Sequence, residues 1–325
     1  MLNVILALLA VRSFLNNVWI FHACKKLHYR YRPSPATLRP DRQITILLPV
    51  LQEAAIIERA VRYIEVCREG LGQVELYIIG TARERDESGT NPTLEHAEAS
   101  ARQLGRVHII EAPRTDGWMV HQLNYAFSHL IATSRHPRKE WIFLINVDSQ
   151  FSREGLEEMI GYINQGVPVL HQCAVFLSNF AALRAPLKAF ALWQSRWTLA
   201  HELKRFALNR KCSYALMHVV GHGLCINLDT VSRYNGFPEE TLTEDLHFGF
   251  YLAAAGEKVV SLRTIEMADH PTTLTDVFRQ KYVWSFGPML YIRYLQAFRR
   301  KFPAKWRANR IRPIVLTLQG LLSFL

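Results

Sequence analysis

The chain contains little cysteine and no paired cysteine motif. Its 325 residues include five widely separated cysteines: Cys24, Cys67, Cys173, Cys212 and Cys225. This spacing excludes a disulfide framework and indicates no zinc site, so reduced thiols are the simplest interpretation. The chain also lacks GxGxxG after its first predicted strand and lacks GxxxxGK[ST] throughout. The two familiar glycine-rich phosphate-binding loops are therefore absent.

Acidic residues are fewer than basic ones. There are 28 Asp and Glu against 39 Lys and Arg, which gives a formal net charge of +11. Such a balance favours an anionic partner. The basic residues concentrate in 25–42 and 293–312, and each cluster lies beside an apolar terminal segment. This arrangement predicts contact with a membrane surface and no nucleic-acid partner.

The two ends of the chain are apolar. Residues 1–24 are about as long as a membrane-spanning helix, although an interfacial amphipathic helix remains an alternative. The basic linker 25–43 that follows predicts that the next domain faces the cytosol. Residues 313–325 are too short to span, so they are either the start of a second membrane helix or a terminal amphipathic helix.

Between these ends, strand-like and helix-like segments alternate. Strands are expected at 43–50, 74–80, 106–110, 140–147, 167–176 and 258–262, with a strand pair at 218–228. Helices are expected at 53–67, 93–104, 120–133, 153–166, 183–208 and 243–256. Such alternation predicts an α/β domain over 44–270 with a mostly parallel sheet flanked by helices.

The fourth predicted strand ends abruptly in "NVDS". The apolar run of "WIFLINVDSQF" stops at Asn146, and Asp148 is its only carboxylate. One interpretation is a turn, because Asn, Asp and Ser often terminate strands. The other is a ligand set at the carboxyl edge of a parallel sheet.

A similar choice applies after the first strand, where Pro49 ends the strand and Glu53 either caps the next helix or binds a ligand.

The segment "LTEDLHFGF" places two acids at a helix start. Thr243 is a candidate N-cap, followed by Glu244 and Asp245 in the first turn. Two acids favour a helix N-terminus without any further function. An acid held there can also act as a general base toward a hydroxyl nucleophile.

Residues 271–312 are expected to form interfacial helices. Within "FRQKYVWSFGP", Gln280 and Trp284 are four residues apart and share one helix face. That face either lies on a membrane or forms a platform, with an indole for stacking and an amide for hydrogen bonding.

Five segments in this order resemble the family-2 glycosyltransferases, particularly the membrane-embedded processive synthases of the cellulose and hyaluronan type. They are "ILLPVLQE", "NVDS", "GHG", "TED" and "QKYVW", spread over residues 44–284. The resemblance implies a Rossmann-like GT-A fold. It also implies a nucleotide-diphosphate sugar across the carboxyl ends of the strands and Mg²⁺ or Mn²⁺ held by a DxD motif.

The resemblance also implies roles for individual residues. "NVD" aligns with DxD, so Asp148 is the expected metal ligand, and Asp245 is the expected base with Glu244 shaping the acceptor site. The donor-binding residues would be Pro49, Glu53, Asn146, Asp148, Gln280 and Trp284. The acceptor-binding residues would be Gly221, His222, Gly223 and Trp284.

Three departures from the family pattern bear on donor binding. No acid directly follows Ile79, where the family has one, and Glu84 or Asp86 are the candidate substitutes. Trp118 and Met119 stand where a basic residue is usual. Val283 replaces the arginine of the QxxRW signature, for which Arg279 or Lys281 are candidate replacements.

We therefore expect a metal-dependent glycosyltransferase at the cytoplasmic face of the cell inner membrane, with a polysaccharide or glycolipid acceptor. Non-processive transfer to a lipid carrier is one alternative, favoured by Val283. Another is a degenerate homologue that serves as a subunit of a polysaccharide synthase. A third is a basic membrane-surface module without sugar chemistry, against which the intact TED and GHG segments argue.

Overall fold

The computed structural model describes residues 6–7, 10–15, 17–19, 21–22, 36–102, 104–217 and 219–322. Much of the predicted membrane helix 1–24 and residues 25–35 of the basic linker lie outside these residues. No helix within the described residues is long and apolar enough to cross a membrane.

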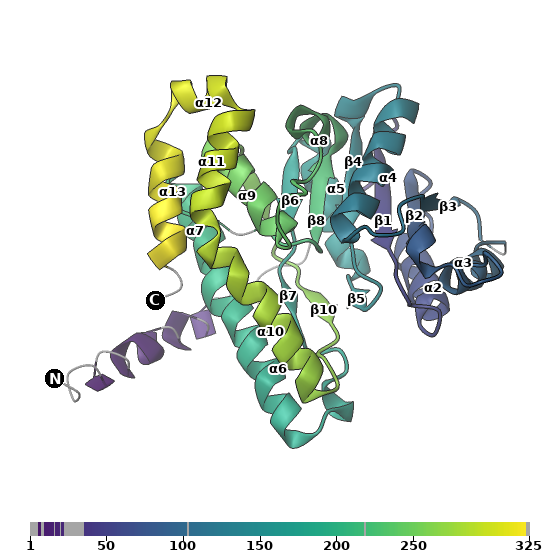
Figure 1. The fold of residues 1–325 in the computed structure, drawn as a ribbon, viewed down its shortest axis with the longest axis horizontal. Coiled ribbons are helices and arrows are strands. Elements are labelled where there is room, and N and C mark those ends of the chain that lie inside the picture. Colours follow the sequence, from purple (N-terminus) through teal and green to yellow (C-terminus); the bar gives the residue numbers. More distant parts are fainter. Residues whose placement is uncertain are drawn as a thin grey trace.

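A seven-stranded sheet forms the centre of the molecule (Figure 1). Its strands, in spatial order, are β3 (Val107–Ala112), β2 (Val74–Thr81), β1 (Gln43–Pro49), β4 (Glu140–Leu144), β8 (Leu224–Asn227), β6 (Val169–His171) and β9 (Val259–Ser261). All neighbours are parallel except β8, which is antiparallel to β4 and β6. The prediction of a mostly parallel sheet is confirmed.

Helices cover both faces of this sheet. They are α2 (Ile57–Arg68), α3 (Pro92–Ala101), α4 (Met119–Thr133), α5 (Arg153–Asn164) and α8 (Leu228–Tyr234), with 3₁₀ turns η1 (Ala82–Glu84) and η2 (Pro137–Lys139). Alternate residues of β1 enter opposite cores, because successive strand side chains point to opposite faces. Leu47 packs with α4 and α8, whereas Ile46 and Leu48 pack with α2 and α5.

A three-stranded sheet adjoins the main one. It comprises β5 (Ser149–Gln150), β10 (Glu266–Ala268) and β7 (Ala174–Val175). The single strand predicted over 167–176 is therefore wrong, since it divides into β6 and β7. Gln172 donates its backbone N–H to the carbonyl of Gly223, and Cys173 accepts from the N–H of Glu266. These bonds direct the chain from one sheet into the other.

The remaining helices form the half of the molecule away from β1–β3 (Figure 1). They are η3 (Phe180–Ala182), α6 (Ala185–Trp197), one π-helical turn η4 (Thr198–Glu202), α7 (Leu203–Lys211), α9 (Glu244–Ala255), α10 (Leu274–Met289), α11 (Tyr291–Lys301), α12 (Pro303–Ala308) and α13 (Ile311–Leu322). The predicted helical stretch 183–208 corresponds to α6, η4 and α7. Helix α13 buries Leu316 and exposes Ile314 and Leu318, and residues 323–325 lie outside the described part.

Candidate active site

Three parallel strands, β1, β2 and β4, deliver acidic residues to one edge of the sheet. The loop after β1 is held by Glu84, which accepts the Gln52 N–H at 2.9 Å, and by Thr93, whose hydroxyl accepts the Glu53 N–H at 3.0 Å. Gln52 adopts a left-handed φ of 59°. Because these side chains capture the loop amides, the helix begins at Ile57. The prediction that Glu53 opens the helix is therefore wrong.

The carboxylates at this edge share one electrostatic environment. Burial, followed by the charges of Asp148 and Glu84, raises the pKa of Glu53 to about 7. Burial also raises the pKa of Asp148, with a further contribution from Asp269 and an opposing one from His222. Several acids that disfavour one another's ionisation form a site that a divalent cation would stabilise.

Asp148 lies in the turn that follows β4, so the turn interpretation of "NVDS" is confirmed, and the ligand interpretation stays a prediction. The Ser149 N–H donates to the carbonyl of Asn146 at 3.1 Å and closes the turn. Asp148 is half-buried beside it, and the acids near it supply oxygen donors only. Mg²⁺ and Mn²⁺ prefer oxygen ligands and often take one or two carboxylates. These residues therefore fit the expected cation.

Glu84 and Asp86 are the two candidates for the acid that the family has after its second strand. The Glu84 carboxylate accepts from the Gln52 N–H and from the Thr93 hydroxyl, so it faces the loop after β1. Asp86 instead accepts from the N–H groups of Ser88 and Thr90 within its own loop. The structure thus brings Glu84, and not Asp86, to the carboxylate edge.

The GHG and TED segments contact each other directly. The Gly221 N–H donates to Oδ2 of Asp245 at 2.9 Å, and the Leu246 N–H donates to Oδ1 at 2.7 Å. Gly223 has a φ of 68°, and a Cβ there would lie 2.2 Å from the carbonyl of Gln172. Residues 219–223 consequently form a loop, and only 224–227 are a strand. The predicted strand pair over 218–228 is wrong, and residue 218 lies outside the described part.

Glu244 is buried and Asp245 is half-buried, which changes their expected ionisation. Thr243 occupies the N-cap position, but its hydroxyl lies 2.7 Å from the Tyr294 hydroxyl and caps no helix amide. Burial raises the pKa of Asp245, against the effect of its two N–H donors. Burial and the Asp245 charge raise the pKa of Glu244 to about 8. The two N–H donors therefore offset only part of the effect of burial on the pKa of Asp245.

A raised pKa suits a general base, because proton transfer is most effective when the pKa of the base is near the working pH. Asp245 receives two backbone N–H bonds that stabilise its ionised form. Burial and the neighbouring Asp245 charge favour the protonated form of Glu244. The two carboxyls therefore differ in their surroundings, since only Asp245 accepts the Gly221 N–H.

His222 adds a cation to the site. Its Nδ1 lies 2.9 Å from Oε1 of Glu266, whose side chain is fully buried. Burial opposes protonation, but the charges of Glu266, Asp148 and Glu202 together outweigh it and raise the pKa of His222 to about 9. His222 is consequently protonated at neutral pH. Sequence reasoning missed Glu266, because the short strand β10 carries no clear pattern.

A cavity of about 300 Å³ opens beside the acid pair. It is lined by Trp118, Met119, Val120, Glu239, Glu240, Thr241, Leu242 and Glu244. Met119 joins it to the GHG loop, since its Cε lies 3.8 Å from where a Cβ on Gly221 would be. An exposed indole among carboxylates suits a polyhydroxylated ligand, which offers C–H faces for stacking and hydroxyls for hydrogen bonds. The sequence had marked Trp118 and Met119 only as departures.

Helix α10 carries Gln280 and Trp284, as predicted. The Trp284 ring lies 5.9 Å from that of Phe176, which in turn lies 6.3 Å from the imidazole of His222. Oε1 of Gln280 is buried without a hydrogen-bond partner in the described part of the chain. Trp284 therefore connects to the site through Phe176, and Gln280 retains an acceptor for a ligand.

Lys281 is one of the two candidate replacements for the missing arginine. Its Nζ lies 3.9 Å from the centre of the Trp284 ring and donates to Oε1 of Gln194 at 2.5 Å. Burial lowers the pKa of Lys281 to about 7. Arg279 instead points to Asp276 at 3.5 Å and is largely exposed. Of the two candidates, only Lys281 contacts Trp284.

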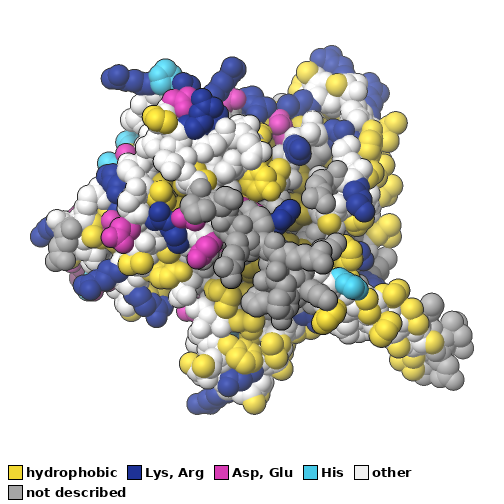
Figure 2. Space-filling model, turned by 180° about the vertical axis from the view of Figure 1, so that it is seen from behind, with side chains coloured by type: hydrophobic (Ala, Val, Ile, Leu, Met, Phe, Trp, Pro, Cys, Tyr) yellow, Lys and Arg dark blue, Asp and Glu magenta, His cyan; other side chains and the backbone are white. Residues whose placement is uncertain are grey.

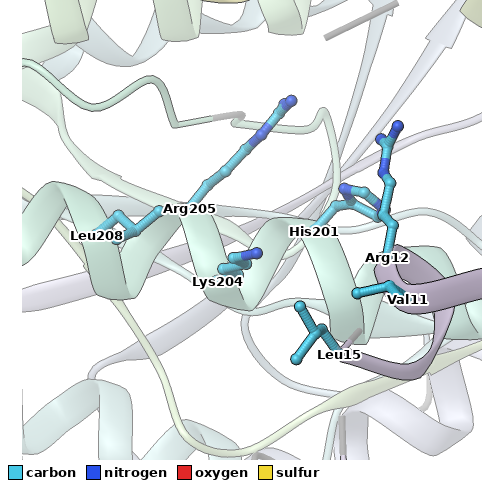
Figure 3. A pocket seen from close by; sticks show the side chains of 7 residues that line it. All are labelled: Val11, Arg12, Leu15, His201, Lys204, Arg205 and Leu208. Atoms are coloured by element: carbon cyan, nitrogen blue, oxygen red, sulfur yellow. The ribbon is translucent and has the colours of Figure 1, made fainter. Parts of the chain in front are cut away.

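A second cavity, of about 460 Å³, lies between the N-terminal segment and the helical stretch from η4 to α7 (Figure 3). Its lining combines aliphatic and cationic side chains: Val11, Arg12, Leu15, His201, Lys204, Arg205 and Leu208. Burial and the charge of Arg205 lower the pKa of His201 to about 4. This cavity offers positive charge next to apolar surface.

A Rossmann-like sheet that ends in carboxylates, with an acid pair beside a sugar-sized cavity, defines a GT-A glycosyltransferase architecture. The chain belongs to glycosyl transferase family group 2, whose family model matches residues 141–325. It is therefore a glycosyltransferase. No curated protein sequence matches it.

Two solved structures show the same fold. Mannosyltransferase PcManGT from Pyrobaculum calidifontis, in complex with GDP-Man and Mn²⁺, is 15% identical with a TM-score of 0.56. The match covers 98% of this chain and 84% of that one. TarS 1–349 of S. aureus, in complex with UDP-GlcNAc, is 12% identical with a TM-score of 0.50, over 87% of this chain and 80% of that one.

Proposed function

We propose that this glycosyltransferase moves a sugar from a nucleotide-diphosphate donor to an acceptor hydroxyl of a polysaccharide or glycolipid at a membrane surface, with Mg²⁺ or Mn²⁺. The observation that carries the proposal is the placement of Asp245. Its carboxylate accepts the Gly221 N–H, and the adjacent Glu244 lines the cavity that holds Trp118. The charge of His222 acts on both Asp245 and Asp148.

The donor would lie across the carboxyl ends of β1, β2 and β4. Asp148, with Asn146 beside it, would hold the cation, and Glu53 and Pro49 would border the nucleotide. The protonated His222 faces the same acids and supplies positive charge for a diphosphate. The GDP-Man and UDP-GlcNAc complexes of the two similar structures support a donor of this class.

Transfer would proceed by in-line attack. Asp245 accepts the proton of the acceptor hydroxyl. The hydroxyl oxygen bonds to the anomeric carbon of the donor sugar, and the bond from that carbon to the diphosphate breaks. Glu244, whose pKa burial raises, donates a hydrogen bond to the acceptor sugar when it is protonated. His222 stabilises the charge that develops on the departing diphosphate. When bound at Asp148, the cation adds Lewis-acid stabilisation of that same charge.

The acceptor end of the proposal rests on the second cavity and the surface around it. Figure 2 shows hydrophobic side chains along the N-terminal segment and over the end formed by α6 and α10. The exposed ones include Phe14, Leu15, Trp193, Trp197, Phe278 and Tyr282. Arg12 and Lys204 place cationic groups beside this apolar surface (Figure 3). Such a combination favours an anionic membrane, here the cytoplasmic face of the inner membrane.

Non-processive transfer to a phosphate-bearing lipid is the second candidate. Two observations favour it: Val283 in place of the signature arginine, and a cavity that combines aliphatic and cationic side chains.

Two experiments test the proposal. Full-length protein is incubated with a series of UDP- and GDP-sugars, with Mn²⁺ or with a chelator, and nucleotide release is measured. We expect one donor to be turned over in a metal-dependent manner, and no turnover of any donor would contradict the proposal. In parallel, Lys204→Glu should weaken flotation with anionic vesicles, whereas Arg135→Glu, at an exposed site in the loop before β4, should not. Equal flotation of both variants would contradict the membrane assignment.

A further inference from the structure

Three side chains to which the proposed reaction assigns no step come together near the GHG loop. They are His171 at the end of β6, Cys173 before β7, and Glu202 in the π-helical turn η4. Their potential ligand atoms all lie within 4.8 Å of one another, which no other three His, Cys, Asp or Glu residues of the described chain achieve. Ligands of one tetrahedral zinc ion lie roughly 3.5 Å apart, given Zn–N and Zn–S bonds of about 2.1 and 2.3 Å. Small side-chain rotations would close the remaining gap.

His171 carries the clearest sign of a missing partner. Its side chain is fully buried, and neither ring nitrogen has a hydrogen-bond partner among the described residues. Buried imidazoles are normally hydrogen-bonded, so each unsatisfied nitrogen requires an explanation. A metal ion bonded to one nitrogen would account for that nitrogen.

Glu202 is the most exposed of the three side chains and lies in an unusual backbone turn. It is half-buried, whereas Cys173 and His171 are fully enclosed. The turn that carries it, Thr198–Glu202, is π-helical between two α-helices. Such π-turns are rare and concentrate at functional sites, because the extra residue reorients a side chain.

We propose that His171, Cys173 and Glu202 bind a borderline-soft divalent metal ion of the zinc class. One nitrogen, one thiolate and one carboxylate match zinc chemistry and differ from the all-oxygen set around Asp148, which suits Mg²⁺ or Mn²⁺. Binding releases the thiol proton of Cys173 to solvent. Three protein ligands leave the fourth position for water.

The ion would connect the strand β6 to the helical stretch α6–α7. Gln172, between two of the ligands, donates its N–H to the Gly223 carbonyl at 2.7 Å. Fixing Gln172 therefore also fixes the loop whose Gly221 holds Asp245. The site is distinct from the donor-edge cation and does not depend on the identity of the sugar.

The test uses Co²⁺ as a probe in place of zinc. Full-length protein is treated with a chelator, desalted and titrated with Co²⁺ while its absorption is recorded. We expect one equivalent to produce a thiolate-to-cobalt charge-transfer band. Zn²⁺ should abolish that band, and excess Mg²⁺ should leave it unchanged. Zn²⁺ should also raise the thermal unfolding midpoint of the chelator-treated protein.

Cys225 offers a matched control. It is as buried as Cys173 and lies on the neighbouring strand β8, but it packs into the opposite core. The band should disappear in Cys173→Ala and persist in Cys225→Ala. Glu202→Gln, which keeps the shape of the side chain, should weaken Co²⁺ binding about tenfold or more while circular dichroism stays unchanged. A wild-type protein without the band, or a band that survives in Cys173→Ala, would overturn the proposal.

Discussion

The backbone N–H of Gly221 donates a hydrogen bond to Oδ2 of Asp245 across 2.9 Å, and this bond joins two motifs that are 24 residues apart. It fixes the rotation of the carboxylate at the start of α9. It also lowers the cost of ionising a buried acid, since the charged form accepts the bond more strongly. The GHG segment thereby positions the carboxylate that we propose as the base.

The loop geometry makes Gly223 sensitive to substitution. A Cβ would meet the Gln172 carbonyl at 2.2 Å, and the φ of 68° disfavours any side chain. We expect Gly223→Ala to lower the free energy of unfolding by roughly 2–4 kcal/mol. Gly161→Ala on α5, where a Cβ meets nothing within 4 Å, should leave it unchanged or raise it. Chemical denaturation of both variants checks this, and equal stability would contradict the described loop.

Asp148 should govern metal-dependent nucleotide binding. Asp148→Asn removes the carboxylate that the cation needs, so the affinity for UDP or GDP with Mn²⁺ should fall by about two orders of magnitude. Asp41→Asn, at the opposite end of β1, is the control and should bind normally. Calorimetric titration with and without Mn²⁺ measures both. Unchanged Mn²⁺-dependent binding in Asp148→Asn would place the cation elsewhere.

Stability should depend on pH through Glu244. Its folded pKa of about 8 exceeds the ordinary value of 4.5, so its protonated form stabilises the fold. That contribution is complete below pH 4.5 and is lost as the pH rises through 8. We expect the thermal midpoint to fall by several degrees over this range, and Glu244→Gln to reduce that fall. Exposed Glu98→Gln should keep the wild-type pH dependence, and an identical profile for Glu244→Gln would refute the assignment.

Trp118 should contribute to sugar binding in the 300 Å³ cavity. Trp118→Ala removes a stacking surface worth about 1 kcal/mol, so KM for the bound sugar substrate should rise several-fold with little change in kcat. Tyr125→Ala, exposed on the helix α4 that follows Trp118, is the matched control. KM and kcat of both variants are measured with the donor that the screen identifies. Equal KM values would exclude this cavity from the substrate path.

Much of the α/β half could be predicted from sequence, because periodicity and burial agree there. The strands β1, β2 and β4 and the helices α4 and α5 have the expected positions. Short elements such as β7 and β10 could not be predicted, since two or three residues carry no period. The start of α2 was misplaced because Glu84, distant in sequence, captures the loop amides.

The candidate site was predictable where one motif contains the chemistry. Asp148 and the acid pair follow from "NVDS" and "TED" together with the family resemblance. The His222–Glu266 pair and the Trp118 cavity depend on contacts between distant segments, which no local pattern encodes. The raised pKa of Asp245 was also not predictable, because the sequence shows a helix start and does not show how deeply it is buried.

The most direct test of the central claim is the transfer rate of Asp245→Asn beside its nucleotide affinity. If Asp245 is the base, transfer should fall by about two to four orders of magnitude, while the affinity for UDP or GDP stays near that of the wild type. Glu244→Gln, measured alongside, should retain far more activity. Wild-type turnover in Asp245→Asn, or loss of activity in Glu244→Gln alone, would contradict the account.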